Sequence, residues 1–213
     1  MMRKLTNRGW LAAAAVPTLV AAGCGDVVRQ GRAPVQAVVE SLTAASGADP
    51  GRFGGTLSSD VLTIRTTPEP CSKDNPCPTI YGDIGQVRMS LVLRSPGSGS
   101  SPAAPSSLNS VTFTRYRVEY RRTDGRREQG LDVPFAFDSA ATFTVPESGS
   151  AVAGFEIVRN IAKAEPPLRA LVTNGNVIST IADVTFYGRD QAGNEVVATG
   201  TVGISFGNFG DPG

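Results

Sequence analysis

The chain has 213 residues, with 20 Lys and Arg against 19 Asp and Glu, and it contains no histidine. The missing histidine excludes Ser-His-Asp and Cys-His catalysis and most catalytic zinc sites. The near balance of charge gives no overall attraction for nucleic acid, so we expect no nucleic-acid partner.

The first 23 residues have the pattern of an export signal. Arg3, Lys4 and Arg8 precede the largely apolar segment 11–22. That segment is shorter than the roughly 20 apolar residues that a membrane-spanning helix needs. A basic start, a short apolar segment and small residues are typical of a cleavable signal peptide. We therefore expect residues 1–23 to be removed during export.

The signal ends in the sequence Val20-Ala21-Ala22-Gly23-Cys24. This segment resembles the bacterial lipobox, with Ala21 at the position where leucine is usual. The resemblance implies that Cys24 is acylated and that residues 24–33 form a lipidated tether, and several acyl chains anchor a protein stably. It also implies a lipid-anchored position on the cell membrane. Gly25 after the cysteine favours the outer membrane of a Gram-negative host, facing the periplasm or the cell surface. The alternative is an ordinary secretory signal with a cysteine nearby.

Residues 34–46 carry a helical pattern. Val35, Val38, Val39 and Leu42 lie at positions i, i+3, i+4 and i+7, which places them on one face of a helix. Pro34 suits the first helical turn and Gly47 suits the end. The spacing predicts one short N-terminal helix that packs on the rest of the domain.

From about residue 56 apolar residues alternate with polar ones, which is typical of half-buried strands. The expected strands are 56–66, 84–94, 109–122, 131–137, 141–145, 153–160, 177–189 and 194–206. A change of parity near Thr114 predicts a β-bulge, and residues 190–194 predict a hairpin loop with positive φ at Gly193. No helical pattern alternates with these strands. The sequence therefore predicts an all-β fold, an antiparallel two-sheet immunoglobulin-like sandwich of about eight strands in one domain over 34–213.

Residues 95–108 are rich in Ser, Pro and Gly. Such a segment contributes little to a core, so we expect a mobile, exposed loop. The segment could also separate two domains. A long loop is favoured, because residues 56–94 alone are too few for a stable core.

Cys71 and Cys77 flank a short turn that contains Asn75-Pro76. Compartments outside the cytoplasm permit disulfides, and the spacing predicts a disulfide between these two cysteines. The alternatives are a metal site or a redox pair. A lone pair of cysteines without further ligands binds metal poorly, and the spacing differs from Cys-x-x-Cys.

Several longer phrases resemble an uncharacterised group of predicted bacterial lipoproteins. They are Gly31-Arg-Ala-Pro-Val35, Tyr116-Arg-Val-Glu-Tyr-Arg-Arg-Thr-Asp-Gly125, Val133-Pro134, Val184-Thr-Phe-Tyr-Gly-Arg-Asp-Gln-Ala-Gly193 and the Phe209-Gly-Asp-Pro212 tail. The resemblance covers most of the mature chain. It supports the lipoprotein architecture and implies no activity or site.

Six arginines gather in one segment and make the strongest candidate for a binding surface: Arg115, Arg117, Arg121, Arg122, Arg126 and Arg127. A basic strand and hairpin tip can hold anionic lipid headgroups, an anionic glycan or an acidic envelope protein. The alternative, which we favour, is a solvated strand face whose charge prevents edge aggregation.

Acidic residues stand at several expected turns, namely Asp74, Asp83, Asp124, Asp132, Asp190 and Asp211. None follows the Asp-x-Asp-x-Asp-Gly spacing of a calcium loop, and turn chemistry explains each one. We expect no metal, no cofactor and no catalytic residue. The sequence favours a non-enzymatic envelope lipoprotein that binds an unidentified ligand. A structural envelope lipoprotein is the alternative, and a hydrolase with a carboxylate pair is a remote one.

Overall fold

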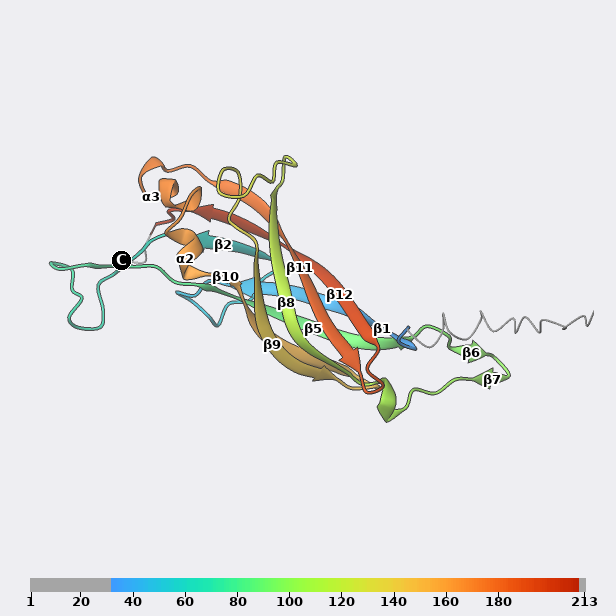
Figure 1. Cartoon of the computed structure of the whole chain (residues 1–213). Helices are drawn as coiled ribbons and strands as arrows, with labels where there is room; N and C mark the ends of the chain where they lie inside the picture. The colour runs from blue at the N-terminus through green and yellow to red at the C-terminus, as the bar shows by residue number, and fades with distance from the viewer. Residues whose placement is uncertain (1–31, 211–213) are drawn as a thin grey trace, which may run out of the picture. The chain divides into compact units, whose positions relative to one another are not determined.

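The computed structural model describes residues 32–210, and strands dominate them (Figure 1). The expected export signal, the lipidation of Cys24, most of the tether and Asp211 lie outside the described residues. The strands are β1 Val35–Ala45, β2 Thr56–Asp60, β3 Thr63–Arg65, β4 Cys77–Thr79, β5 Asp83–Leu93, β6 Gly97–Ser98, β7 Ser101–Pro102, β8 Val111–Arg122, β9 Phe137–Val145, β10 Ser150–Val158, β11 Ile178–Asp190 and β12 Glu195–Gly207. The short helical segments are η1 Ser107–Asn109, α2 Asn160–Lys163, η2 Leu168–Ala170 and α3 Leu171–Asn174.

Two larger sheets build the body of the domain. One has the order β1-β5-β10 and the other the order β2-β12-β11-β8-β9. All their strand pairs are antiparallel except the parallel pair β2 and β12. The larger sheet is curled like half a barrel, and the smaller one lies against it (Figure 1). The all-β, largely antiparallel prediction is therefore confirmed.

The predicted N-terminal helix is wrong, because residues 35–45 form strand β1. Val35 and Ala37 point inward, a bulge between Val39 and Ser41 shifts the register, and Leu42 then points inward. The extra residue places the inward-facing Val35, Val39 and Leu42 at i, i+4 and i+7, a spacing that imitates a helix, whereas Val38 is 37% exposed. The β-branched valines favour the pleated conformation that the pairing with β5 stabilises.

The predicted strand over 131–137 is also wrong, since only Phe137 belongs to a strand. Gly130 has a φ of +78° and donates a hydrogen bond to the carbonyl of Val133, which closes a turn. Pro134 has no N–H to give to a ladder. The predicted strand over 56–66 is divided into β2 and β3 at residues 61–62.

The bulge near Thr114 is confirmed. Phe113 pairs with Gly188 and Arg115 pairs with Tyr187, so Thr114 is left without a partner on β11. A Cβ atom at Gly188 would lie 2.6 Å from the Thr112 carbonyl, which explains the glycine. The predicted hairpin at 190–194 is confirmed as well, with φ of +87° at Gly193.

Aromatic rings fill the space between the two sheets. The ring of Phe186 on β11 meets the ring of Phe155 on β10 edge to face at 5.2 Å. Tyr116 stands 5.0 Å from the same Phe155 ring, and its hydroxyl donates to the Glu156 carbonyl at 2.9 Å. Each large side chain buried in this way contributes about 1.5–3 kcal/mol. The core therefore holds the larger sheet against the smaller one.

Residues 95–108 are all exposed, as predicted, and they include the small β6–β7 hairpin. The backbone N–H of Arg94 donates to the carbonyl of Pro34 at 2.9 Å. This loop therefore leaves the domain beside the point where the described chain begins.

Candidate functional site

The long strands run along the length of the domain, and the loops at their two ends define two ends of the domain (Figure 1). At the entry end lie Arg32, the loop 95–108 and the turns 146–149 and 190–194. At the far end lie the loop 46–55, the segment 61–82, helices α2 and α3, and Phe209. The 11 residues of β1 separate the ends by roughly 35 Å at 3.2–3.4 Å per residue.

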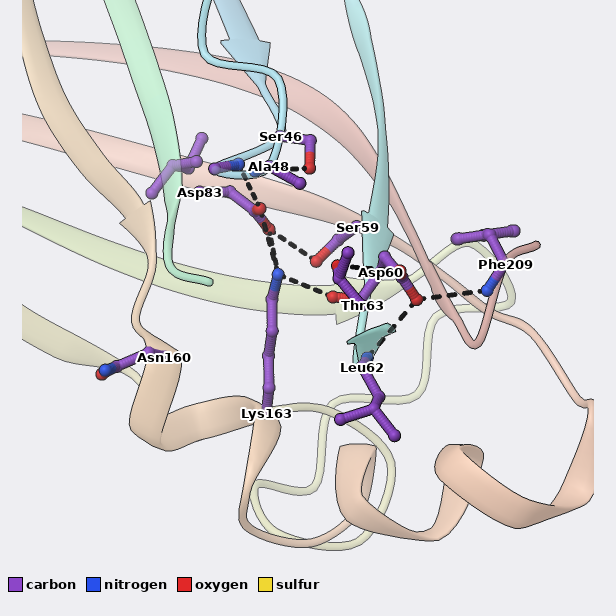
Figure 2. A network of polar contacts seen from close by, with 12 residues as sticks. Ser46, Ala48, Ser59, Asp60, Leu62, Thr63, Asp83, Asn160, Lys163 and Phe209 are labelled. Carbon is purple, nitrogen blue, oxygen red and sulfur yellow. Dashed lines mark hydrogen bonds and ion pairs between the residues drawn. The ribbon is translucent and has the colours of Figure 1, made fainter. Parts of the chain in front are cut away.

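A buried ion pair closes the far end. The Lys163 ammonium lies 3.0 Å from each carboxylate oxygen of Asp83, and the two side chains are 1% and 0% exposed. Lys163 Nζ also donates to the backbone carbonyl of Asp60 at 2.9 Å. Figure 2 shows the lysine side chain reaching from α2 toward these acceptors. The pair thus connects α2 to both β5 and β2.

Two further donors satisfy the Asp83 carboxylate. The Ser59 hydroxyl donates to Oδ2 at 2.6 Å, and the Gly47 backbone N–H donates to Oδ1 at 3.0 Å. We call Asp83, Lys163, Ser59 and the backbone groups of Gly47 and Asp60 the buried network. A buried charge is tolerated when it is paired and its remaining lone pairs are hydrogen-bonded. Both conditions hold here, so the network fixes four separate segments of the far end.

The sequence did not predict a role for Ser59 or Lys163, and Asp83 was expected at a turn. The structure instead places Asp83 at the start of β5, pointing inward with Val87 and Met89. A carboxylate that continues the inward parity of an apolar strand is a signal for a buried partner. That signal was present in the sequence, although it does not say which of the cations is the partner.

Serine, lysine and aspartate are also residue types of nucleophilic catalysis. In this arrangement the Ser59 side chain is 0% exposed, and its hydroxyl donates to a carboxylate. Lys163 directs its ammonium to the same carboxylate. We therefore interpret the network as a brace that joins the two sheets.

Burial perturbs two other titratable groups near the network. Loss of solvent raises the pKa of Tyr120 well above its usual range, and the nearby Asp83 carboxylate acts in the same direction. The Tyr120 hydroxyl donates to the Ile157 carbonyl at 2.6 Å. Desolvation also raises the pKa of Glu156, with Arg159 acting in the opposite direction.

A groove of about 590 Å³ opens at the far end, and we call it the far-end groove. Its walls include Asp49, Arg65, Lys73, Tyr81 and Phe209. Arg65 donates from Nε to the Thr67 carbonyl at 3.1 Å and from Nη1 to the Tyr81 hydroxyl. Its guanidinium also lies 5.8 Å from the centre of the Tyr81 ring. These residues come from separate segments of the chain, so no local sequence pattern predicts that they meet.

The predicted disulfide between Cys71 and Cys77 is confirmed, with Cα atoms 5.4 Å apart. Cys77 pairs with Arg65 across the small sheet of β3 and β4. The disulfide therefore holds the loop that carries Lys73 beside Arg65, on one wall of the far-end groove.

The arginines of β8 and the turn after it have carboxylate neighbours. Arg115 and Arg117 both reach Asp138, at 3.1 and 2.6 Å. Arg121 lies 2.9 Å from Asp183 on β11. These pairs follow the register, since Arg117 pairs with Asp138 across the strands.

The remaining arginines of this group lie around the turn. Arg122 and Arg126 share Asp124, at 3.3 and 2.9 Å, and Arg126 also lies 3.4 Å from Asp132. Arg127 is exposed. We call all six arginines the arginine strip. Because the carboxylates offset most of its charge, the geometry favours the solvated-face interpretation, and anion binding by the strip stays a prediction.

A second hollow of about 750 Å³ lies on the outer face of the larger sheet near the entry end. Arg115 lies over the ring of Tyr187 there, 4.1 Å from its centre. Arg189 and Glu195 stand at the same hollow and form an ion pair at 3.3 Å. Its charged groups are thus already paired with protein.

The acidic residues predicted at turns take different places. The Asp190 carboxylate accepts the backbone N–H groups of Ala192 and Asn194 at 2.9 and 2.8 Å, which is turn chemistry. Asp74 is exposed in the disulfide loop. Over residues 32–210, no group of three or more His, Cys, Asp or Glu side chains is arranged to hold a metal ion. In the same range, no helix is long and apolar enough to cross a membrane.

A scan against protein-family models finds no match, and searches of curated proteins and of solved structures find no similar protein. The resemblance to lipoproteins described above therefore stays a prediction.

Proposed function

We propose that the chain is a lipid-anchored extracytoplasmic lipoprotein, acylated on Cys24, whose immunoglobulin-like two-sheet domain is a non-enzymatic binding module. The partner is an envelope component, either a protein or an anionic glycan. One observation carries the proposal: the described chain enters the domain at one end, and the far-end groove opens at the other.

The dimensions explain why this arrangement suits a tethered binder. Residues 25–32 can span at most about 27 Å when fully extended. A cysteine anchored in the membrane would therefore keep the entry end close to the lipid surface. The length of β1 would then hold the groove roughly 35 Å further out, facing the envelope space.

The properties of the far end support binding in place of catalysis. Its deeply buried polar side chains, Lys163, Asp83 and Ser59, satisfy one another. Lys73 on the groove wall is exposed and has no ion pair or hydrogen bond within residues 32–210. A rigid base beneath a wall with an unpaired charge is suited to holding a ligand.

A structural envelope lipoprotein is the second candidate, and the arginine strip favours it. Ion pairs such as Arg121 with Asp183 leave the outer face of the larger sheet charged but nearly neutral overall. Such a face resists aggregation. A domain of this kind can act as a spacer without a ligand.

Two measurements test the proposal. Intact mass spectrometry of the protein from the membrane fraction should show an acyl mass that the Cys24→Ser variant lacks, and equal masses would refute lipidation. A photo-crosslinking residue placed at Lys73 should then capture an envelope component in cells, whereas one placed at Arg189 on the entry end should not. Capture only from Arg189, or from neither position, would favour the spacer.

A further inference from the structure

We propose that the far-end groove binds an acidic peptide segment of the partner, with a ligand carboxylate held between Arg65 and Lys73. This inference rests on the proposed binding function and names the ligand class for that groove.

Several hydrogen-bond donors in the groove are not used by protein acceptors, and they favour a negatively charged ligand. Arg65 uses its Nε and Nη1 groups on Thr67 and Tyr81, so its Nη2 group has no hydrogen-bond partner within residues 32–210. The Tyr81 hydroxyl accepts from Arg65, so its own proton remains available to a ligand. Lys73 contributes three more donors. Hydrogen bonds from cationic donors to a carboxylate are stronger than hydrogen bonds between neutral groups. The free donors of the groove therefore favour a ligand that carries a carboxylate.

The two acidic residues of the groove do not cancel this preference. The Asp49 carboxylate lies 3.3 Å from Arg52, which offsets its charge. The Asp60 carboxylate accepts the Thr63 hydroxyl at 3.0 Å and the Phe209 backbone N–H at 3.2 Å, as Figure 2 shows. A single ligand carboxylate therefore meets its strongest attraction at Arg65 and Lys73, on the wall that the disulfide braces.

The rest of the lining favours a peptide over a sugar. Ile64, Ala48 and Phe209 supply apolar surface beside the charged wall. The volume, about 590 Å³, lies within the ordinary range of ligand pockets. A peptide with an apolar side chain next to an acidic one matches both parts of this lining. The hydroxyls of Ser46 and Ser58 also line the groove and suit peptide amides.

The disulfide makes the site dependent on oxidation. Lys73 lies between Cys71 and Cys77, and Cys77 is the strand partner of Arg65. Opening the disulfide would let the loop move away from Arg65. The distance between the two cations would then vary, and the site would lose its preformed geometry.

The test uses the full-length protein in non-ionic detergent and fluorescence anisotropy. The probe is a labelled pentapeptide of alternating leucine and glutamate, compared with the same peptide carrying glutamine and an amidated C-terminus. We expect the acidic probe to bind, and Lys73→Gln or Arg65→Gln to weaken it about tenfold, the loss of one charge-assisted hydrogen bond. Arg189→Gln, an exposed arginine at the entry end, should leave the affinity unchanged.

Three results would overturn the inference. They are equal binding of the glutamine probe, no binding of the acidic probe, and binding of a glucuronate oligosaccharide without binding of the peptide. Lys73 is exposed, so its variant tests the site even if Arg65→Gln does not fold. The acyl mass is measured separately, and a failure of the groove is therefore distinct from a failure of the lipoprotein assignment.

Discussion

Charged side chains pair in two regions of this domain, and the two regions differ in nearly every physical respect. In the arginine strip the partners sit on a solvated face, where Arg121 and Asp183 are 44% and 38% exposed. In the buried network, Lys163 and Asp83 are almost fully enclosed. Exposed pairs contribute little because water and salt screen them. The buried pair affects stability strongly, because removing one partner leaves the other charge buried without a counter-charge.

The largest expected effect is therefore in the buried network. Lys163→Met removes the cation and leaves the Asp83 carboxylate buried without a counter-charge. The free energy of unfolding should fall by about 3–5 kcal/mol, measured by urea denaturation. The double variant Lys163→Met with Asp83→Asn should recover part of this loss. A single variant as stable as the parent would show that water reaches the pair.

The second-largest effect is expected at the disulfide, because it holds a loop at the far end, where the buried network also lies. Replacing Cys71 and Cys77 with serine should lower the free energy of unfolding by roughly 2.4 kcal/mol, the loop-entropy value for a ring this small. Thermal denaturation of the oxidised parent and the double variant measures the difference. The parent in reducing agent is the control and should match the variant.

Alkaline pH tests the environment of Tyr120, whose hydroxyl lies near Asp83. Because the folded state keeps Tyr120 protonated while the unfolded chain releases that proton above about pH 10, stability should fall as pH rises beyond this value. Tyr120→Phe should cost about 1.5 kcal/mol at pH 8, since the Ile157 carbonyl loses its donor. The deficit should narrow above pH 10, as followed by urea titrations at each pH. A constant deficit would contradict the assigned burial.

The smallest effect is expected in the arginine strip. Arg121→Ala should change the free energy of unfolding by less than about 0.5 kcal/mol, because both partners are solvated. Adding salt should change the free energy of unfolding of the parent and of the variant by the same amount, within the error of the denaturation measurement. A loss comparable to that of Lys163→Met would remove the distinction between the two regions.

Sequence reasoning succeeded where the information is local. Alternation along β5, β8, β11 and β12 predicted the strands, and a change of parity predicted the bulge at Thr114. The spacing of Cys71 and Cys77 predicted the disulfide. Each of these features depends on residues within one strand or one turn.

The same reasoning failed where the outcome depends on distant partners. Strand β1 was mistaken for a helix because its bulge imitates helical spacing, and only the pairing with β5 decides between the two. The buried network joins Ser59, Asp83 and Lys163, which are far apart in the chain. The far-end groove likewise combines β3, the disulfide loop and Phe209. Nothing local connects such residues before the fold exists.

The parallel pairing of β2 with β12 has a consequence for the folding of the newly synthesised chain. Thr56 of β2 pairs with Gly203 of β12. The edge strand β2 therefore cannot join the larger sheet until β12, the last strand, has been synthesised. Contacts between such distant positions form slowly. The nascent chain therefore stays without a complete larger sheet for most of its synthesis. A copy that ends before β12 would expose the unpaired sides of β2 and β11 and would be a target for proteolysis or aggregation.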